Sequence, residues 1–140
     1  MLLDKGLLEM IVNKSFQFIK TISYADSVIV KEKARNLEML KDRTFMRIKI
    51  PHFTFNVFEN VISIHMEFVK GEVLNKHNKL PFKHIIWEDL VKRPDPYSAA
   101  GYHPSNFIVN NTGLYFVDLE DMRFIEHKER MIKFKKDFLK

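Results

Sequence analysis

Residues 101–121 place an asparagine and an aspartate at the outer ends of two short apolar runs. Asn106 precedes the first run, a turn follows at residues 110–113, and the second run ends at Asp118. Two apolar runs joined by a turn rich in Asn and Gly are typical of an antiparallel hairpin, which returns the chain to its starting point. The amide and the carboxylate are therefore expected at the same end of a hairpin. Both groups supply hard oxygen ligands that suit Mg²⁺.

The length and composition are consistent with one compact domain. The chain has 140 residues, 46% of them hydrophobic, with 13 phenylalanines, which is enough to build a core. The lack of cysteine excludes disulfides, thiolate zinc sites and a cysteine nucleophile, and it fits a reducing, cytoplasmic location. No apolar run reaches the length of about 18 residues that a transmembrane helix needs. Asp4 and Glu9 interrupt the N-terminal apolar residues, so a signal peptide is not expected.

Hydrophobic periodicity predicts an α+β fold. Residues 1–13 fit a short helix or a strand equally well. Alternating patterns predict strands over residues 15–22, 53–58 and 61–69, and the last two form a hairpin through a turn at Glu59 and Asn60. Helical spacing predicts helices from Asp26 or Ser27 to about Lys41, from Phe82 to Lys92, and from about Arg123 to Lys140. On the first of these helices, the expected inner face consists of Val30, Ala34, Leu37 and Lys41.

The stretch 101–121 resembles the catalytic and metal-binding loops of the protein-kinase-like superfamily. In that superfamily, a catalytic-loop asparagine and the aspartate of the next loop hold the metal. The stretch looks closest to the small-molecule branch, the aminoglycoside phosphotransferases and lipopolysaccharide core kinases, which carry His-Gly-Asp-x-His-x-x-Asn. His103, Pro104 and Asn106 are retained. The His-Gly-Asp triplet reads Ala99-Ala100-Gly101, so Gly101 replaces the catalytic aspartate.

The resemblance spans roughly residues 16–122 and implies a minimal protein-kinase-like fold. Such a fold has a small antiparallel sheet, one helix in its N-terminal half and a reduced helical second half. The expected parts are a sheet-rich part like a kinase N-lobe over about 1–70, a hinge, short helix and catalytic hairpin over 71–122, and a basic amphipathic helix over 123–140.

The resemblance also implies ATP and Mg²⁺ as cofactors. Lys20 matches the phosphate-binding lysine and Glu32 the helix glutamate that pairs with it, although Glu38 competes for that role. Residues 65–72 resemble the hinge, where backbone groups at Glu67 and Val69 would hold an adenine ring. Asn106 and Asp118 would bind the metal, and Glu120 or Asp121 can add a further oxygen ligand.

Several departures from the kinase pattern favour weak activity or none. Only Gly6 precedes Lys20, so a Gly-rich phosphate loop is missing, and residues after 122 are too few for the large helical half. His103 is either a structural histidine that fixes its loop or a substitute proton acceptor. Asp95 is a second candidate base. The alternative function is a pseudokinase-type binding or regulatory module. The phosphate acceptor stays open: a sugar, an antibiotic, a lipid headgroup and a protein hydroxyl all fit.

The basic charge is concentrated at the C-terminal end. Residues 123–140 contain seven Lys or Arg against three Asp or Glu, a charge of +4 out of the total of +5. Apolar residues recur at intervals of seven: Phe124, Met131 and Phe138, and also Ile125, Ile132 and Leu139. This segment is either a helix that packs on the domain with solvated lysines or a contact for nucleic acid, an anionic surface or a partner helix. A homodimer and a basic nucleic-acid-associated protein are therefore further hypotheses.

Overall fold

The chain divides into two compact units. The computed structural model describes residues 18–95 and 97–140, so the predicted element over 1–13 lies outside the described residues. The first unit comprises Met1–Lys41 and Pro51–Val69, and the second comprises Asp42–Ile50 and Lys70–Lys140. The first unit therefore ends at Val69. Residues 42–50, by contrast, belong to the second unit.

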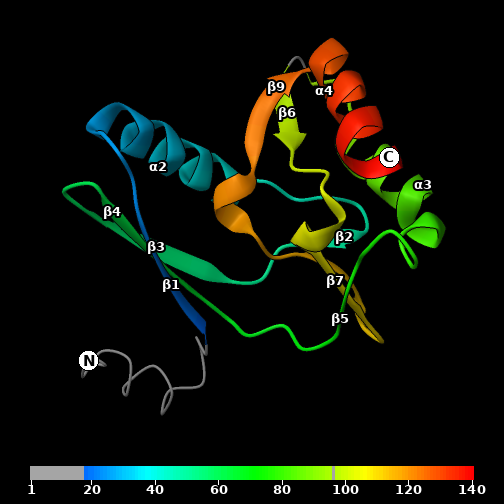
Figure 1. Ribbon diagram of the computed structural model, residues 1–140, viewed down its shortest axis with the longest axis horizontal. Helices are drawn as coiled ribbons and strands as arrows, with labels where there is room; N and C mark the ends of the chain where they lie inside the picture. The colour runs from blue at the N-terminus through cyan, green and yellow to red at the C-terminus, as the bar shows by residue number, and fades with distance from the viewer. Residues whose placement is uncertain (1–17, 96) are drawn as a thin grey trace. The chain divides into compact units, whose positions relative to one another are not determined.

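Over its described residues, 18–41 and 51–69, the first unit is a three-stranded antiparallel sheet with one helix (Figure 1). Its elements are β1 (Phe18–Ser23), α2 (Ser27–Lys41), β3 (Phe53–Phe58) and β4 (Val61–Met66), and β4 lies between β1 and β3. Helix α2 packs on β3 and β4. The predicted hairpin of β3 and β4 is confirmed, because Phe58 pairs with Val61 across the turn.

The start of α2 is set by an aspartate cap. The Asp26 carboxylate accepts a hydrogen bond from the backbone N–H of Ile29 at 3.0 Å, which confirms the predicted N-terminus. The buried side chains of α2 are Val30, Leu37 and Leu40. Lys41 is exposed, because an ammonium group is costly to bury, so the predicted buried face is wrong at that position. Leu40 takes the buried position instead.

The second unit contains two small sheets. Its four-stranded sheet has the order β2-β8-β7-β5, and a separate two-stranded sheet pairs β6 with β9. The pairs are antiparallel except for β2 and β8, which run parallel. The strands are β2 (Ile48–Lys49), β5 (Glu72–Val73), β6 (Tyr97–Ala100), β7 (Phe107–Asn110), β8 (Gly113–Phe116) and β9 (Arg123–Glu126). The β7–β8 hairpin is the one predicted from the sequence.

Short helices complete the second unit. The 3-10 helix η1 (Leu80–Phe82) leads into α3 (Lys83–Ile86), which continues as the π-helical turn η2 (Trp87–Val91). The 3-10 helices η3 (Pro104–Asn106) and η4 (Leu119–Asp121) flank the hairpin. The chain ends with α4 (His127–Lys133) and the π-helical turn η5 (Phe134–Leu139). The observed protein is therefore α+β, and no helix among the described residues is long and apolar enough to cross a membrane.

The C-terminal helix differs from its prediction in start and in face. It begins at His127 instead of about Arg123, because residues 123–126 form β9 and pair with β6. Its fully buried side chains are Arg130, Phe134 and Phe138, which recur every four residues, whereas Ile132 and Leu139 are exposed. The predicted heptad face is therefore wrong at these two positions.

Arg130 is a fully buried cation that ties together three segments of the second unit. Its guanidinium donates to the backbone carbonyls of Val91 at 3.1 Å, Ile125 at 2.7 Å and Arg93 at 3.0 Å. Burial lowers the pKa of Arg130, and the nearby Tyr102 and Asp95 act in the opposite direction. A buried charge is tolerated when its donors are all satisfied, and carbonyl acceptors meet that need here.

Candidate functional site

The β7–β8 hairpin brings Asn106 and Asp118 to the same end of its sheet. Phe107 pairs with Phe116, and the backbone N–H of Val117 donates to the carbonyl of Asn106 at 2.8 Å. Pairing thus extends one residue past both strands. Asp118 follows Val117 directly, so its backbone lies beside that of Asn106. This juxtaposition is the one predicted from the sequence.

The side chain of Asn106 is held in a fixed direction by its own loop. Asn106 is buried, and its Nδ2 donates to the carbonyl of Gly101 at 3.2 Å. Its backbone N–H donates to the carbonyl of His103 at 2.9 Å within the 3-10 turn η3. Because the amide nitrogen is used by Gly101, the amide oxygen Oδ1 is the atom available to accept a donor or bind a cation.

Asp118 stands at the junction between β8 and η4. Its side chain is half-buried and does not cap η4, whereas its carbonyl accepts from the N–H of Asp121 at 2.9 Å. Of the two further candidate ligands, Glu120 is half-buried and Asp121 is exposed. Three carboxylates therefore lie within four consecutive residues, two of them half-buried and one exposed.

Gly101 stands where the kinase pattern has its aspartate, and packing leaves little space there for a side chain. A Cβ atom at this position would lie 2.9 Å from Cζ and 3.0 Å from Cε1 of Phe116. Phe116 is fully buried and makes an edge contact with Phe107, with ring centroids 5.4 Å apart. The Phe116 ring on β8 thus occupies space that a side chain at position 101 would need.

The two candidate replacement bases are both engaged in other contacts. His103 is exposed, and its Nδ1 lies 2.8 Å from the Ser105 hydroxyl. This contact fits the loop-fixing interpretation, with a hydroxyl partner. Asp95 forms ion pairs with Arg93 at 3.1 Å and Arg43 at 3.7 Å, which favour a structural role.

The residues predicted to contact the nucleotide lie in the first unit. Lys20 is half-buried on β1, opposite Ile64, and Glu32 and Glu38 are exposed on α2. Glu67 and Val69 follow β4, and the Val69 side chain is buried.

Glu67 is joined to His52 by two hydrogen bonds. Its N–H donates to the His52 carbonyl at 3.0 Å, and its Oε1 accepts from the His52 N–H at 2.9 Å. These contacts commit the Glu67 backbone N–H to His52.

The donor set at the hairpin end suits Mg²⁺ in the presence of phosphate. Among the described residues, no group of three or more His, Cys, Asp or Glu side chains gathers to hold a metal. Mg²⁺ does not require such a cage, because it is usually bound by one or two protein oxygens together with substrate phosphates and water. In a complex with phosphate, the Asn106 amide oxygen and the Asp118 carboxylate would supply that number of ligands.

Sequence reasoning missed Asp89, which positions the strand next to the hairpin. Asp89 is buried in η2, and its Oδ2 accepts from the backbone N–H groups of Arg47 and Ile48, both at 2.7 Å. These bonds hold the start of β2 against η2, and β2 in turn pairs with β8. In the sequence, Glu88-Asp89 looks like part of a solvated helix face, so no local signal distinguishes this carboxylate.

Comparisons of the chain with protein-family models, with curated proteins and with solved structures find no match.

Proposed function

We propose that this protein is a protein-kinase-like nucleotide-binding module that holds Mg²⁺ and ATP, with weak phosphate transfer or none. The observation that carries the proposal is the ordered end of the β7–β8 hairpin. There, the amide of Asn106 is fixed on the Gly101 carbonyl and the Asn106 carbonyl pairs with Val117. Asn106 Oδ1 and the Asp118 carboxylate would hold Mg²⁺, which when bound neutralises charge on the nucleotide phosphates.

The site supports binding better than catalysis. Gly101 offers no carboxylate, and the close approach of Phe116 opposes the addition of one. His103 and Asp95 are engaged with Ser105 and with two arginines, respectively. A site that orients metal and phosphate but lacks a positioned base retains affinity while losing rate.

The kinase resemblance also assigns nucleotide contacts to four residues outside the hairpin. Lys20 would bind phosphate and Glu32 would orient it. Because the N–H of Glu67 is committed to His52, adenine recognition would use the Glu67 carbonyl as acceptor and the Val69 N–H as donor. These assignments follow from the kinase resemblance and are tested separately from the metal site.

A nucleic-acid contact through residues 123–140 is less well supported. Arg130 is fully buried and is held by backbone carbonyls, so it is withdrawn from any external surface. Nucleic-acid affinity scales with the number of cations that reach phosphates. The exposed basic charge of this segment is therefore smaller than its composition indicates.

Thermal unfolding in the presence of ATP, with and without Mg²⁺ or Mn²⁺, tests the proposal. A ligand present at about 100 times its Kd stabilises the folded state by about 2.7 kcal/mol. For a chain of this size, that corresponds to a rise of roughly 8–10 °C in the unfolding midpoint. We expect the rise with ATP to require the metal and to be lost in Asp118→Ala.

Asp42→Ala is the matched control, because Asp42 is an exposed carboxylate in the turn after α2 and should leave the shift intact. A metal-independent shift, or one that survives Asp118→Ala, would refute the metal site. No shift at millimolar ATP would reject nucleotide binding altogether. Lys20→Met then tests the phosphate contact assigned to Lys20. We expect a smaller rise in the unfolding midpoint with ATP, and an unchanged dependence of that rise on the metal.

A further inference from the structure

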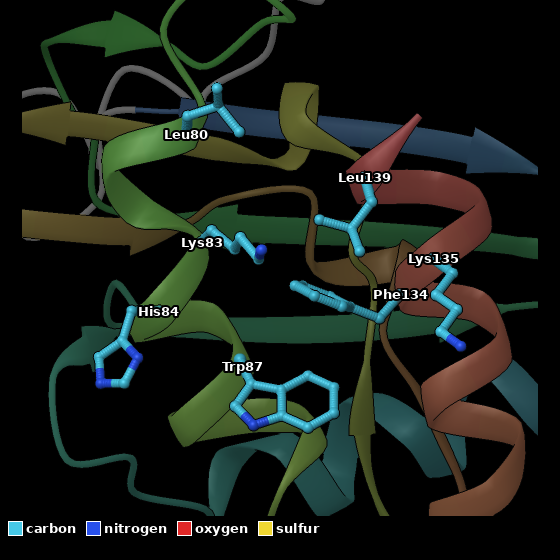
Figure 2. Close-up of a pocket in the computed structure, with 7 residues that line it drawn as sticks. All are labelled: Leu80, Lys83, His84, Trp87, Phe134, Lys135 and Leu139. Carbon is cyan, nitrogen blue, oxygen red and sulfur yellow. The ribbon is translucent and has the colours of Figure 1, made fainter.

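A groove in the second unit is separate from the hairpin site. It has a volume of about 490 Å³ and lies between the α3–η2 segment and η5 (Figure 2). This volume is within the range of roughly 300–1,000 Å³ that is usual for small-molecule sites. None of its residues belongs to the hairpin that carries Asn106 and Asp118.

The apolar part of the groove is aromatic and partly open to solvent. Trp87 and Phe134 line it, with ring centroids 5.5 Å apart, and Phe134 stacks on the buried Phe138 at 5.2 Å. Leu80 and Leu139 border it with 66% and 39% of their surfaces exposed. Exposed apolar side chains gathered around a hollow indicate a binding site, because a bound molecule would remove this apolar surface from water.

The polar residues of the groove are all basic. Lys83, His84 and Lys135 line it, and no acidic side chain does so. Within residues 18–95 and 97–140, neither lysine forms an ion pair, whereas His84 lies 4.0 Å from Glu88. The groove thus combines an apolar lining with two uncompensated positive charges.

We propose that this groove binds a small amphiphilic carboxylate, with a hydrocarbon chain on Trp87 and Phe134 and the carboxylate at Lys83. Figure 2 shows the Lys83 side chain pointing from α3 into the space between α3 and η5, whereas Lys135 points along η5 away from it, so the charge that faces the groove is that of Lys83. An acidic amphipathic helix places apolar side chains at the centre of such a groove and acids at its margins, which the position of Lys83 opposes. A single short chain with one terminal carboxylate matches both features.

Binding in this groove does not depend on nucleotide binding, and the groove contains its own fluorescent side chain. Trp87 is the only tryptophan of the chain, so intrinsic fluorescence monitors the groove alone. We would titrate the protein with dodecanoate below its micelle concentration, and in parallel with dodecanol and dodecyltrimethylammonium. We expect saturable binding of dodecanoate, about tenfold weaker binding of the alcohol and weaker binding still of the cation.

Charge-neutral variants separate this site from non-specific adsorption. Lys83→Gln should weaken dodecanoate about tenfold, to the affinity of dodecanol. Lys128→Gln is the matched control, because Lys128 is exposed on α4 and outside the groove, and it should leave affinity unchanged. Equal binding of dodecanoate and dodecanol, or an unaltered affinity in Lys83→Gln, would overturn the proposal. So would a Trp87 signal that responds to an acidic amphipathic peptide but not to dodecanoate.

Discussion

A side chain at position 101 is predicted to destabilise the second unit, so its effect on folding has to be measured before any effect on phosphate transfer is interpreted. Carbon atoms pack at about 3.5–4.0 Å, but a Cβ at residue 101 would lie 2.9 and 3.0 Å from the Phe116 ring. The ring cannot easily withdraw, because Phe116 is fully buried and contacts Phe107. Overpacking of this kind costs about 1–3 kcal/mol, so Gly101→Ala should lower the free energy of unfolding by that amount.

A double-mutant cycle identifies the cause. Phe116→Leu removes the ring atoms that the new Cβ would meet, and by itself it should cost about 1–2 kcal/mol through lost packing. In Gly101→Ala combined with Phe116→Leu, the clash is absent, so the two losses should be less than additive by about 1–2 kcal/mol. Urea unfolding followed by circular dichroism measures all four proteins, and an unchanged m-value shows that the comparison is valid.

The cycle can fail in two distinct ways. If Gly101→Ala unfolds at the same urea concentration as the parent protein, the space at residue 101 is larger than the structure indicates. If the two losses add within about 0.5 kcal/mol, any destabilisation has a cause other than Phe116. If the coupling is found, Gly101→Asp with Phe116→Leu becomes the appropriate protein in which to seek phosphate transfer from ATP.

Three further predictions concern buried polar groups. Arg130→Met leaves the carbonyls of Val91, Ile125 and Arg93 without their donor and should cost about 3–5 kcal/mol in urea unfolding, whereas exposed Arg123→Met should change stability by less than about 0.5 kcal/mol. Asp89→Ala should cost about 3 kcal/mol and speed hydrogen exchange at Arg47 and Ile48, and Glu88→Ala should leave that exchange unchanged. Burial raises the pKa of Tyr102 above its usual value of about 10, and Arg130 partly opposes this shift. The unfolded chain therefore loses this proton first, and stability should fall above pH 10 by up to about 1.4 kcal/mol per pH unit. Tyr102→Phe should remove that loss, and exposed Tyr97→Phe should not.

The sequence predicted the elements that are determined by local pattern. Strands β3 and β4 follow from alternating apolar residues, and α2 follows from a cap at Asp26 and an apolar stripe. The β7–β8 hairpin follows from the Asn-rich turn between two apolar runs, so the approach of Asn106 to Asp118 was predictable as well. In each case, the residues that define the element are neighbours in the chain.

Features that depend on distant partners were not predictable. Strand β9 forms because β6 lies beside it, and residues 123–126 alone also fit a helix. Nothing in a Lys- and Arg-rich segment indicates that Arg130 is the buried cation, because its acceptors lie on η2, on β9 and in the loop after η2. The reason for Gly101 was similarly hidden, because Phe116 lies fifteen positions away in the chain.

The path of residues Asp42–Ile50 has a practical consequence for dissecting the protein. This segment departs from the first unit, contributes β2 to the sheet of the second, and then returns. A fragment that starts at Lys70 would lack β2, so one edge of β8 would be unpaired and Asp89 would lose both of its N–H donors. Unpaired strand edges template aggregation. A cut at Lys70 would therefore give an aggregation-prone fragment, and joining residues 42–50 to its N-terminus through a short linker should restore its solubility.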